Sequence, residues 1–163
     1  MKMLMRAPYS GVAILVFVLT TYIPAHAQKW IDDRFASVNG VRLHYLISGK
    51  GEPVLLLHGY AENSHMWRPL IPELAKTHTV IAPDLRGFGQ SSKPVGGYTK
   101  KAMAQDVHAL AKSLGYHRTI IVGHDIGLMV AYAYAAQYAA EVDRIVLMDA
   151  FLPALVIGRA SGC

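Results

Sequence analysis

Ile120-Ile-Val-Gly-His-Asp-Ile-Gly127 is the stretch of sequence that decides the fold. Its β-branched start predicts a buried strand, and the alanine-rich run that begins at Ile126 predicts a helix. Gly123 and Gly127 each lie two positions from Asp125, and their lack of side chains permits a sharp strand-to-helix turn. The stretch therefore predicts a turn that raises the Asp125 side chain above the end of a strand.

The rest of the chain repeats this alternation of strand and helix. Uninterrupted apolar runs predict parallel strands covered on both faces, at residues 54–57, 80–82, 120–122 and 145–148. Helical patterns predict helices at residues 66–76, 100–114 and 126–139. The dipeptide Asn39-Gly40 predicts a two-residue hairpin turn between antiparallel edge strands at 35–38 and 41–46. The predicted fold class is α/β, a mostly parallel sheet with helices on both faces.

Residues 1–27 have the features of a secretory signal peptide. Lys2 and Arg6 precede an uncharged apolar run at residues 11–23, and Ala25-His26-Ala27 forms a small-residue cleavage site. The apolar run is shorter than the roughly 20 residues that cross a bilayer as a helix. We therefore expect a secreted or periplasmic protein, cleaved after Ala27 and free of the membrane afterwards. An uncleaved membrane anchor is the alternative.

One domain is expected after the signal peptide, since no repeat or linker divides the chain. Residues 28–153 are expected to form the N-terminal half of a core domain, and residues 154–163 an irregular tail. The formal net charge of +5 includes Lys2 and Arg6, and the remaining basic residues are scattered, so nucleic-acid binding is not expected. The single cysteine, Cys163, forms no disulfide within the chain. No metal and no cofactor are expected, and the oligomeric state is left open.

Asp125 has two interpretations. An aspartate between a strand and a helix is often an N-cap, whose side chain accepts hydrogen bonds from the first free N–H groups of the helix. Between two such glycines it is instead a nucleophile, because an aspartate carboxylate needs no base to activate it and suits displacement at a saturated carbon. Three other segments favour the nucleophile. His58-Gly59-Tyr60 follows the first buried strand, Pro83-Asp-Leu-Arg-Gly-Phe-Gly-Gln-Ser-Ser92 follows the second, and Asp149 follows the last.

With these motifs, residues 35–153 resemble the α/β-hydrolase superfamily. The aspartate at position 125 places the resemblance in the branch of epoxide hydrolases and haloalkane or haloacetate dehalogenases. His124-Asp125-Ile126-Gly127 and the export signal are most similar to secreted bacterial epoxide hydrolases of the Cif type. The resemblance implies the N-terminal half of that fold, ending before a cap domain and the last strands.

The resemblance implies a role for each motif residue. Asp125 would be the nucleophile, and Asp149 the acid of the catalytic triad, with an ordinary strand-end aspartate as the alternative. The backbone N–H groups of Tyr60 and Ile126 would form the oxyanion hole. Residues that brace these loops would be His58, Gly59, Gly123, His124 and Gly127. Ala61-Glu62 stands where epoxide hydrolases frequently carry proline, so this loop departs from the family's pattern.

The implied activity is the opening of an epoxide to a vicinal diol through an alkyl-enzyme ester. None of the histidines after the signal peptide occupies the expected place of the base, so we expect residues 1–163 alone to be inactive. These histidines are His44, His58, His65, His78, His108, His117 and His124. A dehalogenase acting on a halogenated compound is one alternative, but Ile126 replaces the tryptophan or arginine that halide-releasing families tend to place there. A non-catalytic binding protein of the same fold is the other alternative. For either enzyme the partner is a small-molecule substrate, an epoxide or a halogenated compound, whereas the binding protein would bind a small molecule or a partner.

Overall fold

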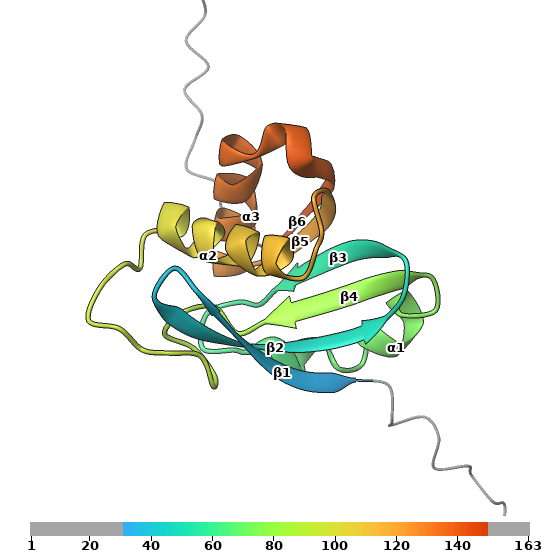
Figure 1. Ribbon diagram of the computed structural model, residues 1–163, viewed down its shortest axis with the longest axis horizontal. Helices are drawn as coiled ribbons and strands as arrows, with labels where there is room; N and C mark the ends of the chain where they lie inside the picture. Colours follow the sequence, from blue (N-terminus) through green and yellow to red (C-terminus); the bar gives the residue numbers. More distant parts are fainter. Residues whose placement is uncertain (1–30, 150–163) are drawn as a thin grey trace, which may run out of the picture.

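The computed structural model describes residues 31–149. The expected signal peptide with its cleavage after Ala27, the tail at 154–163 and Cys163 lie outside the described residues. Six strands form one mixed sheet in the order β1-β2-β4-β3-β5-β6 (Figure 1). The strands are β1 (Asp32–Val38), β2 (Val41–Gly49), β3 (Glu52–Leu57), β4 (His78–Pro83), β5 (Thr119–His124) and β6 (Val142–Met148).

The sheet confirms the predicted fold class. β4, β3, β5 and β6 run parallel, whereas β2 pairs antiparallel with both β1 and β4. The hairpin between β1 and β2 turns at Asn39 and Gly40, whose φ angles of 48° and 75° are those that a two-residue turn requires. The predicted edge hairpin is therefore confirmed.

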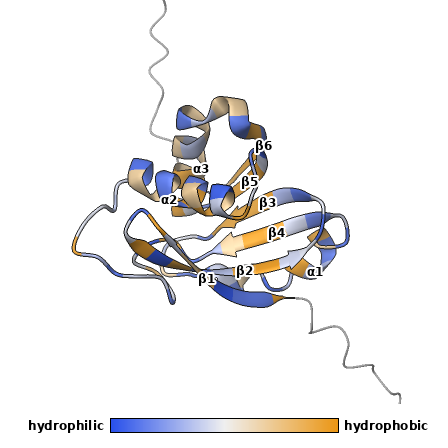
Figure 2. Ribbon diagram, in the orientation of Figure 1, coloured by the Kyte–Doolittle hydropathy of each residue, from blue (hydrophilic) through white to orange (hydrophobic). Residues whose placement is uncertain are grey.

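Two apolar layers cover the sheet, one on each face. Alternate residues of β3 supply both layers, because successive side chains of a strand point to opposite faces. Leu55 and Leu57 belong to the layer beneath the helices α2 and α3, and Leu56 belongs to the opposite layer with Trp67 and Ile71. Each buried leucine contributes about 2 kcal/mol of transfer free energy. Figure 2 shows the apolar residues concentrated in the inner strands.

The helices are divided between the two faces (Figure 1). α2 (Lys100–Ser113) and α3 (Ile126–Gln137) pack together on one face, and a 3-10 turn, η3 (Ala139–Glu141), leads from α3 into β6. Thr99 caps α2 by accepting a hydrogen bond from the N–H of Ala102, and Gly115 follows the helix with a φ of 86°. Both helices agree with the prediction to within two residues. None of the helices within residues 31–149 has the length and apolarity needed to span a membrane.

The helix predicted at residues 66–76 was wrong in extent. The structure has a 3-10 turn, η2 (Ser64–Trp67), and a single helical turn, α1 (Ile71–Leu74). Pro69 lies between the two turns and Pro72 lies within α1, and neither residue has an N–H to donate to a continuous helix, which accounts for the break. The apolar side chains Trp67 and Ile71 nevertheless face the sheet, which explains the apparent helical pattern.

β6 departs from the prediction of a strand covered on both faces. It pairs with β5 along one edge and contacts α3, but among the described residues it is the last strand of the sheet. Ile145 is 38% exposed and Val146 is 44% exposed. An apolar strand with this exposure is a surface suited to pairing.

Candidate active site

The carboxyl ends of β3, β5 and β6 bring the candidate residues together. The register pairs Leu57 with Gly123 and His124 with Met148, so the three parallel strands end at the same edge of the sheet. Tyr60 follows β3, Asp125 follows β5 and Asp149 follows β6. In open parallel sheets this edge is the usual position of a binding site.

The turn at Asp125 has the tight geometry that its flanking glycines predict. Asp125 has a φ of 50° and a ψ of −118°, a conformation that costs a non-glycine residue on the order of 1–3 kcal/mol. A Cβ atom on Gly123 would lie 2.4 Å from the carbonyl oxygen of Gly127, and one on Gly127 would lie 2.4 Å from that of Leu57. Glycine is therefore required at both positions for this turn to form.

The Asp125 side chain is turned toward the loop after β3. Its Oδ2 atom accepts a 2.8 Å hydrogen bond from the backbone N–H of Tyr60, and it makes no capping bond to α3. The capping interpretation therefore does not describe this residue. The N–H of Ile126 is at the start of α3, where helical N–H groups have no partner within the helix. Of the two N–H groups predicted as an oxyanion hole, that of Tyr60 binds the Asp125 carboxylate.

His58 braces the loop that carries Tyr60. Its Nδ1 atom donates to the carbonyl oxygen of Gly59 at 2.8 Å, and its Nε2 atom accepts from the N–H of Leu85 at 3.0 Å. This pair of bonds requires a neutral ring with the proton on Nδ1. Burial lowers the pKa of His58, although the hydrogen bond to the Gly59 carbonyl opposes that shift. The neutral form is therefore the one that the surroundings favour.

Glu62 is a site residue that the sequence analysis did not single out. Its Oε2 atom accepts a 3.0 Å hydrogen bond from the N–H of Gly59 and lies 3.4 Å from Nδ1 of His124. A Cβ atom on Gly59 would lie 2.5 Å from this carboxylate oxygen and 2.8 Å from Nδ1 of His124, so a side chain there would displace these two groups. The spacing of an acidic residue three positions after Gly59 is the sequence pattern that could have indicated Glu62.

Asp149 lies at the edge of the site and contacts His124. Its Oδ2 atom is 3.5 Å from Nε2 of His124, its φ is 57°, and its side chain is 88% exposed. Glu62, His124 and Asp149 therefore form a row of titratable side chains beside Asp125. The structure thus brings together the predicted residues Tyr60, Asp125, Ile126 and Asp149 with their bracing loops.

His44 and His108 contact groups outside the candidate site. His44 is buried beneath the loop after β4, and His108 stacks on Tyr138 and contacts Glu141. Within the described part of the chain, no group of three or more histidine, cysteine, aspartate or glutamate side chains is placed to hold a metal ion.

Comparison with known proteins identifies the family. Residues 52–162 match the family described as alpha/beta hydrolase fold. The chain belongs to the α/β-hydrolase family. The resemblance and the fold class predicted from the motifs are therefore confirmed.

Among characterised relatives, this α/β-hydrolase is similar to the soluble epoxide hydrolase of Corynebacterium sp. (strain C12), with 45% identity over 74% of the chain and 42% of that protein. It is also similar to the fluoroacetate dehalogenase of Burkholderia sp., with 38% identity over 72% of the chain and 40% of that protein. The solved structure of the epoxide hydrolase CorEH without ligand has a TM-score of 0.74 and 42% identity, over 82% of this chain and 47% of that one. The chain spans less than half the length of these relatives.

Proposed function

We propose that this chain carries the nucleophile of an epoxide hydrolase. The observation that supports the proposal most is the Asp125 carboxylate, which points away from its own helix and accepts the Tyr60 N–H. The 45% identity to a soluble epoxide hydrolase supports the same activity. The substrate of the whole protein is then a small molecule with a three-membered epoxide ring.

In this proposal the two carboxylate oxygens of Asp125 have different tasks. Because the Tyr60 N–H holds Oδ2, Oδ1 is the free atom that attacks an epoxide carbon. The carbon–oxygen bond of the ring breaks, its electron pair stays on the epoxide oxygen, and an acid donor protonates that oxygen. Water then adds to the ester carbonyl, and the N–H groups of Tyr60 and Ile126 donate to the negative charge on Oδ2. Release of the diol restores the carboxylate with one oxygen from water.

A dehalogenase is the second candidate, favoured by the 38% identity to a fluoroacetate dehalogenase. The same nucleophile would displace halide from carbon, and the intermediate would again be an ester of Asp125. Ile126 has no side-chain donor for a halide ion or a substrate carboxylate, which favours the epoxide.

The two candidates are separated by assaying the protein expressed from its complete gene. Incubation with a panel of terminal epoxides and with fluoroacetate, followed by measurement of diol and of fluoride, is expected to give diol only. Asp125→Asn should abolish diol formation, whereas Asp143→Asn, at an exposed aspartate that pairs with Arg118, should leave it unchanged. Fluoride without diol would favour the dehalogenase, and neither product would favour a binding protein.

We also propose that residues 28–163 do not turn over an epoxide by themselves. The two described histidines at the strand ends beside Asp125 face other groups. His58 bonds Gly59 and Leu85, and His124 contacts Glu62 and Asp149. This polypeptide should form no diol above the rate of its Asp125→Asn variant, and diol at a higher rate would contradict the proposal.

Export is part of the proposal and rests on the charged start, the apolar run and Ala25-His26-Ala27. Mass spectrometry of the secreted or periplasmic protein should give Gln28 as the first residue. A soluble cytoplasmic product that retains Met1 would contradict it.

A further inference from the structure

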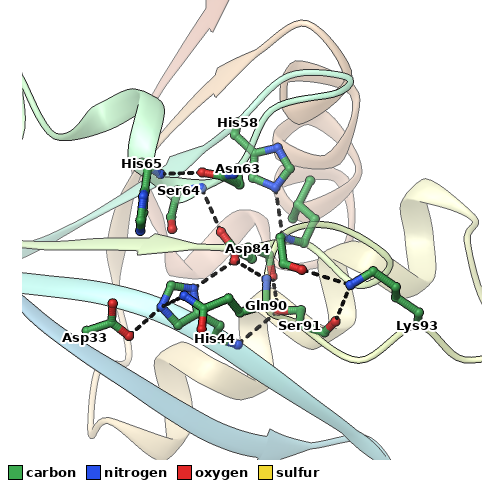
Figure 3. Close-up of polar contacts among 12 residues, drawn as sticks. Asp33, His44, His58, Asn63, Ser64, His65, Asp84, Gln90, Ser91 and Lys93 are labelled. Atoms are coloured by element: carbon green, nitrogen blue, oxygen red, sulfur yellow. Dashed lines mark hydrogen bonds and ion pairs between the residues drawn. The ribbon is translucent and has the colours of Figure 1, made fainter.

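His44 is a buried histidine held between two carboxylates (Figure 3). Its Nδ1 atom lies 2.8 Å from Oδ2 of Asp84, and its Nε2 atom lies 2.7 Å from Oδ1 of Asp33. The His44 side chain is fully buried, the Asp84 side chain is 2% exposed and the Asp33 side chain is 46% exposed. The ring is thus fixed at its inner end by a buried carboxylate and at its outer end by a half-exposed one.

Asp84 joins His44 to two backbone segments. Its Oδ1 atom accepts from the N–H of Ser64 at 2.7 Å, and its Oδ2 atom accepts from the N–H of Gln90 at 2.7 Å as well as from His44. Burial by itself would raise the pKa of Asp84, but these hydrogen bonds hold it below its usual value. The buried carboxylate is therefore ionised, so the His44 nitrogen that faces it donates.

The segment after β3 is attached to residues 84 and 85 near both of its ends. At its far end, Ser64 donates its N–H to Asp84. At its near end, His58 accepts the N–H of Leu85 and donates to the Gly59 carbonyl. Tyr60 lies between these attachments, and its N–H donates to Asp125. The direction of the Tyr60 N–H therefore depends on where Asp84 and Leu85 are held.

We propose that His44 is a positioning residue for the oxyanion loop. By orienting the Asp84 carboxylate, the ring holds residues 58–64 in place and aims the Tyr60 N–H at Oδ2 of Asp125. The effect on catalysis rests on the proposed function, whereas the effect on the Tyr60 N–H does not. His44 contacts no reacting atom, so its influence is transmitted through Asp84.

Two substitutions of His44 separate positioning from packing. The amide of asparagine takes the place of Nδ1 and can still donate to Asp84. The amide of glutamine takes the place of Nε2 and reaches only toward Asp33. Both variants lose the volume of the ring, but only His44→Gln loses the bond to Asp84. If His44 acted only by filling space, His44→Asn and His44→Gln should have the same effect on the loop.

The first measurement is hydrogen exchange of the Tyr60 amide, followed by NMR in the protein from the complete gene. His44→Gln is expected to accelerate this exchange about tenfold, the equivalent of one lost hydrogen bond, and His44→Asn to leave it near the wild-type rate. The amide of Leu110 in α2 should keep its rate in both variants. Equal acceleration in both variants, or no acceleration in His44→Gln, would overturn the proposal.

A second variant applies if His44→Gln does not fold. Asp33→Ala releases the outer end of the His44 ring and should accelerate exchange of the Tyr60 amide about threefold. An unchanged exchange rate would overturn the proposal.

The second measurement is the rate of each catalytic step. In His44→Gln the Tyr60 N–H should no longer point at Oδ2 of Asp125. Hydrolysis of the Asp125 ester should then be at least tenfold slower, because negative charge develops on Oδ2 in that step. Formation of the ester should change less than twofold, since the same N–H stabilises the carboxylate before attack. Equal slowing of both steps would overturn the positioning role. If the wild-type protein forms no ester, the proposed function fails, and the exchange measurement still decides the role of His44.

Discussion

At the scale of single residues, Asp125 differs from a capping aspartate in two ways. Its backbone adopts a positive φ that a cap does not require, and its carboxylate binds an N–H group from another strand-end loop. The strain of this conformation is offset by packing around the turn, where Gly123 and Gly127 permit contacts that a side chain would prevent. Both features direct the carboxylate toward the loop after β3, at the carboxyl edge of the sheet.

His58 makes the stability of this loop sensitive to acid. Because burial lowers its folded-state pKa, the unfolded chain binds a proton more readily, and the free energy of unfolding falls as the pH drops below about 6.5. His58→Gln, whose amide oxygen can accept the Leu85 N–H, should remove this part of the pH dependence. Urea melts between pH 7.5 and 5.5 measure the effect. An identical slope in wild type and variant would contradict the assignment of His58 as a neutral brace.

At the scale of elements, the sequence was most informative where a backbone conformation restricts the residue type. Asn39-Gly40 predicted the hairpin, and Gly123 and Gly127 predicted the turn, because few other residues adopt those conformations. The apolar pattern at residues 66–76 indicated one helix, but the same side chains face the sheet from two short turns with Pro69 between them. The role of His44 depends on Asp84, which is 40 residues away in the sequence, and no local pattern records it.

The turn after β5 should tolerate no side chain at Gly127. Gly127→Ala would place a Cβ atom 2.4 Å from the carbonyl oxygen of Leu57, and relieving that overlap should cost about 1–3 kcal/mol of unfolding free energy. Gly96→Ala is the matched control, because a Cβ atom there meets nothing within 4 Å and the change should stay within about 0.5 kcal/mol. Denaturant melts of both variants provide the comparison. A Gly127→Ala protein as stable as wild type would contradict the close packing of this turn.

At the scale of the whole molecule, the described sheet has an edge strand on each side. The hairpin of β1 and β2 ends the sheet on one side, whereas β6 ends the described sheet with Ile145 and Val146 partly exposed. The catalytic candidates lie at the ends of β3, β5 and β6, so the site and the exposed strand adjoin each other.

The polypeptide of residues 28–163 is therefore expected to be poorly stable and to self-associate through β6. Val146→Lys should shift it toward monomer, because a charge on an edge strand opposes pairing. Val95→Lys is the control, since Val95 is fully exposed but lies in a loop outside the sheet. Sedimentation velocity measures the proportions of monomer and oligomer, and denaturant melts measure the free energy of unfolding. A wild-type polypeptide that is a monodisperse monomer with a cooperative transition would contradict this prediction.

The most direct test of the central claim is a single turnover of an epoxide in H2¹⁸O, with the protein from the complete gene in excess over substrate. If Asp125 forms an ester that water hydrolyses at its carbonyl, the peptide that contains Asp125 gains one ¹⁸O and the first diol contains none. Peptide mass spectrometry locates the label. Labelled diol with an unlabelled Asp125 peptide would mean that water attacks the epoxide directly, and Asp125 would not be the nucleophile.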